Sequence, residues 1–215
     1  MANVGLLFVG VVLFMNGLML LGKIDARAAA LINLFVGALQ VVTPTYLIFA
    51  ANGAPDKILS ASGIYFFGFT YLYVGIGLLA GMDTSGVGYF SLIVAIAALG
   101  YSFVNFHLLG DPPLAVIWLY WAFLWFLFFL VLGLKKDYLT RYTGWVTAIE
   151  GWITGLIPGF LLLSGYWKHP TETAIALGAF GVVVFILLWP LTRKQRLAAR
   201  RQEPENENTT TTGPG

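Results

Sequence analysis

Long apolar stretches separated by short polar segments dominate the hydropathy pattern of this chain. A helix needs about 20 mostly apolar residues to cross the hydrocarbon core of a membrane. It also satisfies its backbone hydrogen bonds internally, which an open strand in lipid does not. The pattern therefore predicts an all-α, polytopic membrane bundle of seven transmembrane helices, at about 3–22, 28–50, 63–81, 87–107, 113–134, 143–166 and 171–191.

The charged residues lie mostly between and after these stretches. Only 10% of the residues are charged and 59% are hydrophobic, a composition far from that of soluble domains. With the N-terminus outside, every Lys and Arg except Lys57 and Lys168 falls on the inner side. The positive-inside rule thus predicts an N-out, C-in orientation. The apolar start lacks a basic n-region and is interpreted as a retained first helix.

Aromatic residues form two regular stripes inside the predicted spans. Trp118, Trp121 and Trp125 occur at i, i+3 and i+7, so a helix places the three indoles on one face. Phe67 and Tyr71 occur at i and i+4 on the third span. We expect the two stripes to face each other along a narrow route for a small polar molecule. The alternative is an aromatic core stripe with no passage.

Glu150 is a carboxyl residue within the sixth predicted span. Intramembrane acids are costly and by default mark a site that faces the protein interior. Counting from the helix ends places Asn16, Asn33 and Glu150 at one level of the inner leaflet. We expect an amide of Asn16 or Asn33 to bond Glu150 or to share its water, because unpaired polar groups in hydrocarbon are costly. The alternative is a structural acid bonded to backbone.

The residues that usually support catalysis or metal binding are scarce. The chain has no Cys, and His107 and His169 lie near the outer ends of spans, away from any cluster with metal-ligand spacing. No Ser or Thr stands in a recognised catalytic motif with a His or Lys base. We therefore expect no metal, no cofactor, no enzymatic activity and no nucleic-acid partner.

Several segments resemble the urea/amide channel family of the AmiS/UreI type, which includes relatives of the acid-activated urea channels. The most specific are WLYWAFLW, within residues 115–126, and AIEGWITGLIP, within residues 143–162. Supporting matches, in chain order, are GLLFVGVVLFMNG (5–17), LINLFVGAL (31–39), FGFTYLY (67–73) and YFSLIVAI (89–96). The resemblance covers about residues 1–167.

The resemblance implies a pore inside each protomer of a homo-hexamer in a bacterial inner membrane. It implies urea or short-chain amides such as acetamide as solutes, and a functional link to a cytoplasmic amidase or urease. The domains would be a six-helix channel domain at 1–167, an additional transmembrane helix at 168–192 and a disordered cytoplasmic tail at 193–215. The implied pore lining is Leu6, Val9, Leu13, Phe67, Tyr71, Trp118, Trp121, Leu124, Trp125 and Glu150, with Asn16, Asn33 and Tyr73 as supporting polar groups.

The outer segments depart from the acid-gated urea channel. Residues 51–62 and 108–113 are predicted as short outer loops without His, whereas a histidine gate needs groups that titrate between about pH 5 and 8. We therefore predict a passive channel of the amide branch that is not strongly acid-gated. Two alternatives stay open: a proton- or ion-coupled transporter that uses Glu150, and a structural or sensory membrane protein without conduction. The choice between urea and amide is open as well.

Overall fold

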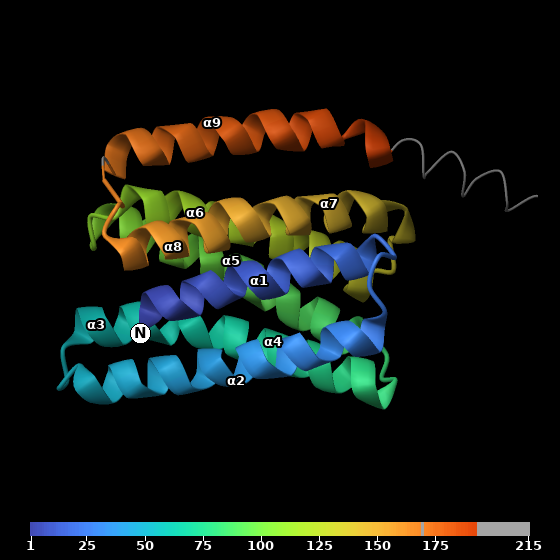
Figure 1. Cartoon of the computed structure of the whole chain (residues 1–215), viewed down its shortest axis with the longest axis horizontal. Helices are drawn as coiled ribbons and strands as arrows, with labels where there is room; N and C mark the ends of the chain where they lie inside the picture. Colours follow the sequence, from blue (N-terminus) through green and yellow to red (C-terminus); the bar gives the residue numbers. More distant parts are fainter. Residues whose placement is uncertain (169, 193–215) are drawn as a thin grey trace, which may run out of the picture.

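The computed structural model describes residues 1–168 and 170–192. Within them, seven helical spans are long and apolar enough to cross a membrane, and they lie side by side in one bundle (Figure 1). This confirms the predicted all-α, seven-span membrane fold. The predicted disordered tail, 193–215, lies outside the described residues.

Four of the spans are interrupted or continued by short helical segments. The first two spans are α1 (Ala2–Leu20) and α2 (Ala26–Ala50), and the third joins α3 (Pro55–Ser62) to α4 (Ile64–Ala80). The fourth is α5 (Ser85–His107), and the fifth joins α6 (Pro112–Phe128) to the π-helix η1 (Phe129–Gly133). The sixth span consists of the 3₁₀ turn η2 (Asp137–Leu139), α7 (Thr140–Glu150), the π-helix η3 (Gly151–Leu156) and α8 (Ile157–Ser164). The seventh span is α9 (Pro170–Leu188) with a short extension to Thr192.

The segment 51–62, which was expected to be a loop, is partly helical. Pro55 occupies the first turn of α3, where its fixed φ suits a helix and its missing N–H costs nothing. The third span therefore begins at Pro55 and passes through Gly63 into α4. The polar composition of α3 concealed the helix, because hydropathy reports membrane depth rather than helical conformation.

Close backbone contacts hold the bundle together where glycines meet the two π-helices. A Cβ added at Gly10 of α1 would lie 2.2 Å from the backbone nitrogen of Leu156 in η3. A Cβ added at Gly88 of α5 would lie 2.1 Å from the backbone nitrogen of Gly133 in η1. Small residues of this kind let helices approach closely in lipid, and π-segments often occur at functional sites. Each π-helix thus packs against a glycine of a neighbouring span.

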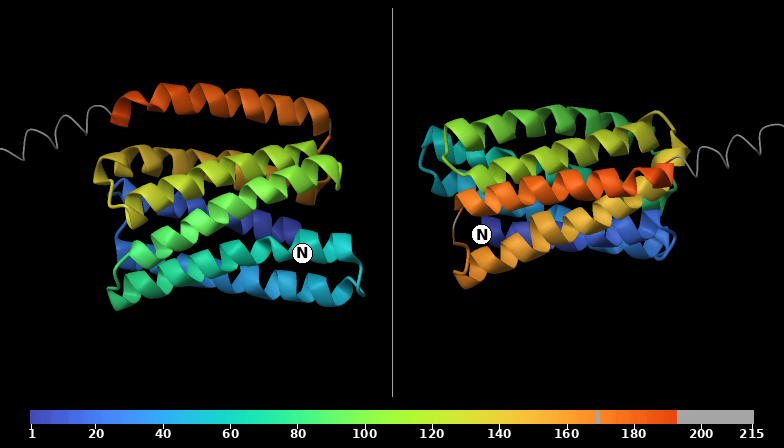
Figure 2. Two further views of the ribbon diagram at one scale, coloured as in Figure 1. Left: turned by 180° about the vertical axis from the view of Figure 1, so that it is seen from behind. Right: turned by 90° about the horizontal axis from the view of Figure 1, so that it is seen from above.

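Helix α9 lies on the outside of the bundle in the views of Figures 1 and 2. It packs mainly on α6, where the Tyr120 hydroxyl donates a hydrogen bond to the carbonyl oxygen of Leu177 at 2.5 Å. Tyr142 of α7 makes a longer bond of 3.4 Å to the carbonyl oxygen of Phe185. The start of α1 and the end of α9 lie at opposite ends of the bundle, as an odd number of spans requires. The N-out, C-in orientation itself stays a prediction.

Candidate functional site

Two cavities lie inside the bundle, one toward each end. The outer cavity, of about 180 Å³, is walled by α1, α2, α3, α4, α5, α6, α8 and Trp167. The inner cavity, of about 300 Å³, is walled by α1, the start of α2, α4, α5, α6 and η1, and it reaches the loop that joins α4 to α5. The names outer and inner follow the predicted orientation. Both cavities are lined mainly by apolar and aromatic side chains, as small-molecule sites usually are.

Three helices contribute side chains to both cavities in the same register. On each helix one residue lines the outer cavity, and a residue four positions later, on the same face, lines the inner cavity. All six side chains are at most 3% exposed. The pairs are Val9 and Leu13, Phe67 and Tyr71, and Trp121 and Trp125. The stripes predicted from spacing therefore meet along one line through the bundle.

Four rings separate the two cavities, and we call Phe67, Tyr71, Trp121 and Trp125 the aromatic barrier. The Phe67 ring centroid lies 4.6 Å from that of Trp121 and 5.1 Å from that of Trp125, both in T-shaped geometry. Edge-to-face pairs of this kind stabilise packing by about 0.5–1.5 kcal/mol each beyond area burial. The barrier is therefore a packed aromatic layer that a solute meets after entering either cavity.

Threonines fix the two indoles of the barrier. Trp121 Nε1 donates to Thr154 Oγ1 at 3.1 Å, and Trp125 Nε1 donates to Thr70 Oγ1 at 3.3 Å. Each threonine in turn donates to a backbone carbonyl oxygen of its own helix. The indole N–H groups are thereby satisfied inside the protein, so that the barrier offers a passing solute ring faces and edges together with the Tyr71 hydroxyl, which has no hydrogen-bond partner within the described residues.

The expected hydrogen bond from an asparagine to Glu150 is wrong. Asn16 and Asn33 pair with each other instead, through Nδ2-to-Oδ1 bonds of 3.0 and 2.6 Å, and Asn33 also donates to the carbonyl oxygen of Ala29. Glu150 is fully buried, and neither carboxyl oxygen has a hydrogen-bond partner within residues 1–168 and 170–192. The amides of Asn16 and Asn33, on the adjacent helices α1 and α2, therefore satisfy each other's hydrogen bonds and leave Glu150 without a partner among the described residues.

The predicted site residues divide into three groups. The outer cavity is lined by Leu6, Val9, Phe67, Trp118 and Trp121. The inner cavity is lined by Leu13, Asn16, Tyr71, Tyr73 and Trp125. Buried behind these walls, and lining neither cavity, are Asn33, Leu124 and Glu150.

The family comparison agrees with this geometry. The profile described as "AmiS/UreI family transporter" matches residues 1–166. The chain belongs to this family. The match ends before α9, so that the seventh span lies beyond the matched segment.

Among similar proteins, the chain is 53% identical over 187 residues to the "Putative transporter protein AmiS2" of Rhodococcus erythropolis, covering 87% of this chain and 90% of that one. It is 50% identical over 199 residues to the "Putative amidate substrates transporter protein" of Mycolicibacterium smegmatis, covering 93% and 92%. The solved urea channel of Helicobacter pylori in its closed state has 32% identity and a TM-score of 0.71, covering 78% of this chain and 100% of that one.

These relationships place the protein among multi-pass membrane transporters and channels of the amide/urea type rather than among enzymes. The resemblance predicted from sequence is thereby confirmed. The cavities and the aromatic barrier therefore belong to a member of the AmiS/UreI family.

Several residues of this AmiS/UreI protein line the cavities although spacing did not single them out. Gln40, Ser60 and Asn105 line the outer cavity, and Ser91 and Phe128 line the inner one. Gln40 had a usable signal, since a primary amide within an apolar span is as unusual as the acid that drew attention to Glu150. For Asn105, near the end of a span, sequence alone carried no comparable signal.

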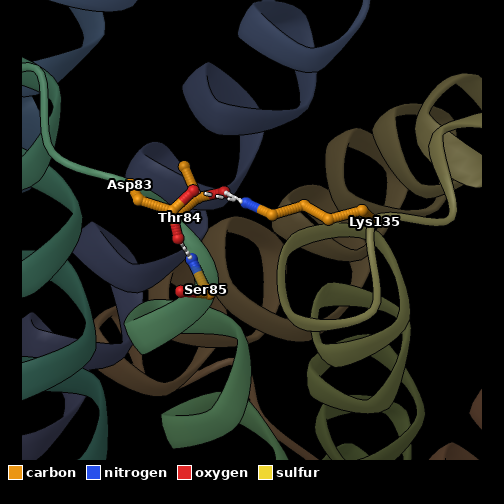
Figure 3. A network of polar contacts seen from close by, with 4 residues as sticks. All are labelled: Asp83, Thr84, Ser85 and Lys135. Atoms are coloured by element: carbon orange, nitrogen blue, oxygen red, sulfur yellow. Dashed lines mark hydrogen bonds and ion pairs between the residues drawn. The ribbon is translucent and has the colours of Figure 1, made fainter.

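An ion pair ties two loops together beside the inner cavity (Figure 3). Lys135 Nζ lies 2.8 Å from Asp83 Oδ2 and also donates to Thr84 Oγ1 at 2.8 Å. Asp83 Oδ1 accepts the backbone N–H of Ser85 at 2.8 Å. Hydrogen bonds from Lys135, and then from Ser85, hold the pKa of Asp83 below its ordinary value. Asp83 and Thr84 both line the inner cavity, so the Asp83–Lys135 ion pair lies at the edge of that cavity.

Proposed function

We propose that this AmiS/UreI protein is a passive channel for small, neutral, planar solutes, namely urea or short-chain aliphatic amides such as acetamide, with a pore in each protomer. The observation that carries this proposal is the line of two cavities that meet at the aromatic barrier. A planar solute can pass between flat rings after small ring movements. Hydrated ions cannot, because they would lose water without gaining a replacement charge partner.

The proposed path begins at Leu6, Val9 and Trp118 and ends near Asn16 and Tyr73. Because threonines occupy the two indole N–H groups of the barrier, the solute meets ring faces there and one polar group that is unpaired among the described residues, the Tyr71 hydroxyl. We assign Leu124 and Glu150 the role of holding the lining helices in place, since both are buried behind the walls.

The decisive experiment is solute uptake by liposomes that contain the purified full-length protein. We expect acetamide and urea to enter these liposomes faster than protein-free liposomes, and we expect a proton gradient of either sign to leave the rate unchanged. A gradient-dependent rate would favour the alternative, a proton-coupled transporter. Liposomes with the protein but without added permeability to either solute would contradict the proposal.

Acidification from about pH 7 to about pH 5 should change amide uptake by less than about twofold. His107 is exposed and packs beside Phe103 and Phe106, outside both cavities. The lowered pKa of Asp83 means that its stabilising contact is present above the ordinary value of 3.8 and is lost only as pH falls through the lower folded value. The Asp83–Lys135 ion pair thus stays charged between about pH 7 and about pH 5.

Uptake measured at matched internal and external pH tests this expectation, with protein-free liposomes at each pH as the baseline. His169 lies outside the described residues, and uptake by the His169→Gln variant should show the same flat pH profile as the wild type. A steep rise in uptake toward pH 5 would contradict the proposal of a channel without strong acid gating.

We further propose a homo-hexamer in a bacterial inner membrane. The support is the family membership together with large apolar side chains on the exposed faces of α2 and α5, among them Phe35, Phe49 and Phe103. Native mass spectrometry of the detergent-solubilised protein measures the number of protomers directly. The functional link to a cytoplasmic amidase or urease stays a prediction.

A further inference from the structure

Asn105 on α5 presents an unused hydrogen-bond acceptor at the outer cavity. Its side chain is 3% exposed and lines that cavity. Its Nδ2 donates to the carbonyl oxygen of Tyr101 at 2.7 Å, whereas its Oδ1 has no hydrogen-bond partner in the part of the chain that the structure describes. A buried acceptor left without a partner destabilises the folded protein, so it calls for a functional explanation.

The orientation of this amide follows from its partner. A backbone carbonyl can only accept, so the atom of Asn105 that faces Tyr101 must be the nitrogen. The oxygen is therefore the atom that remains available. It can accept a hydrogen bond from an N–H or O–H group but cannot donate one.

Other polar groups of the outer cavity also present oxygen. Gln40 is 2% exposed, and its Nε2 donates one hydrogen bond to the carbonyl oxygen of Gly5 at 2.9 Å, which leaves its oxygen able to accept from a solute. Asp111 also lines the cavity, with its backbone N–H bonded to the carbonyl oxygen of Asn105 at 2.9 Å. The oxygens of Asn105 and Gln40 can accept solute N–H groups, and the negative charge of Asp111 disfavours solute carboxylates.

A flat aromatic surface lies in the same cavity. The Trp118 ring stacks on Tyr101 with centroids 4.7 Å apart and an interplanar angle of 20°. The Tyr101 hydroxyl shares a 2.7 Å hydrogen bond with Ser62 Oγ, which fixes the stack. Gly63 makes room for it, because a Cβ there would lie 3.0 Å from the Trp118 ring. A planar solute can thus rest on a rigid indole.

We infer that the outer cavity contains a recognition subsite for a primary amide or urea, in which Asn105 Oδ1 accepts a solute N–H group while the solute plane lies against Trp118. The cavity of about 180 Å³ has room for such a solute. The inference rests on the proposed channel function and deepens it, because it gives the channel a selectivity step before the aromatic barrier. Amides are retained at this step, and the corresponding carboxylates are turned away.

Competition between two solutes tests the subsite. Uptake of radiolabelled urea by liposomes containing the full-length protein is measured against increasing unlabelled acetamide. In Asn105→Leu, the half-inhibitory acetamide concentration should rise about two- to twelve-fold, which corresponds to the loss of one neutral hydrogen bond. Asn105→Asp keeps an acceptor oxygen at the same place, and its half-inhibitory concentration should stay equal or fall.

Both variants lose the bond from Nδ2 to Tyr101, so a purely structural role would shift them alike, and equal rises would overturn the inference. An unchanged value in Asn105→Leu, or wild-type uptake that acetamide does not inhibit, would overturn it as well while leaving conduction established. Wild-type protein that takes up neither urea nor acetamide would instead contradict the proposed function. Should Asn105→Leu fail to elute as a single assembled species, Asn105→Ala removes the amide without added bulk.

Discussion

Replacing Trp125 with alanine should reduce the preference for acetamide over bulkier amides such as butyramide by tenfold or more. Trp125 is fully buried, lines the inner cavity, and packs edge-to-face against Phe67, whose ring faces the outer cavity. Removing the indole therefore takes one large ring out of the barrier and joins the two cavities. A tenfold loss corresponds to about 1.4 kcal/mol of lost discrimination, which one missing ring in a narrow passage can account for.

Stopped-flow light scattering of proteoliposomes measures the permeability ratio of the two amides. Trp152→Ala is the matched control, because Trp152 is 48% exposed on η3, packs against Phe14 and lines neither cavity. Its permeability ratio should equal that of the wild type. If Trp125→Ala retained the wild-type ratio while assembling normally, the aromatic barrier would not be the selectivity element.

The membrane spans and the aromatic stripes could be predicted from the sequence because both follow from simple spacing. Apolar length alone determines the seven spans, and positions 118, 121 and 125 share a face in any α-helix. The structure adds which helices face that stripe. Phe67 contacts Trp118, Trp121 and Trp125, and this confirms that the third and fifth spans oppose each other.

The polar partners could not be predicted, because depth along a helix does not determine rotation about its axis. Counting along the helices placed Asn16 and Asn33 at the level of Glu150, yet only the two asparagines are bonded to each other. The π-helix η3 begins directly after Glu150, so the 3.6-residue phase does not carry across it. The bond from Trp121 to Thr154, which depends on that altered phase, was invisible to helical spacing.

The acceptor at Asn105 was missed for a related reason. An asparagine near the end of a span normally meets water, and only its backbone-bonded amide nitrogen shows that its oxygen turns elsewhere. The sequence thus indicated where the proposed passage runs but not the hydrogen-bonding groups that we propose select its solutes. Which atom of such a group is left free depends on contacts that spacing does not show, as the bond from Asn105 to Tyr101 within α5 illustrates.

Replacing Gly88 with alanine should destabilise the protein by about 3 kcal/mol and lower its apparent Tm by roughly 6–12 °C. The added Cβ would lie 2.1 Å from the nitrogen and 2.4 Å from the Cα of Gly133, and 2.7 Å from the carbonyl carbon of Leu132. These are backbone atoms, which no rotamer change can move. Helix α5 must therefore separate from η1, and Val87 and Leu132 will shift in the wall of the inner cavity.

Gly100→Ala is a control on the same helix, since a Cβ there meets nothing within 4 Å. Alanine is the better helix former by about 1 kcal/mol, so this variant should match or slightly exceed the wild-type Tm. Thermal unfolding followed by tryptophan fluorescence compares the two variants in one detergent. Equal Tm values would contradict the backbone contact between α5 and η1. The wall of the inner cavity that these two elements form, next to Trp125, would then be arranged differently.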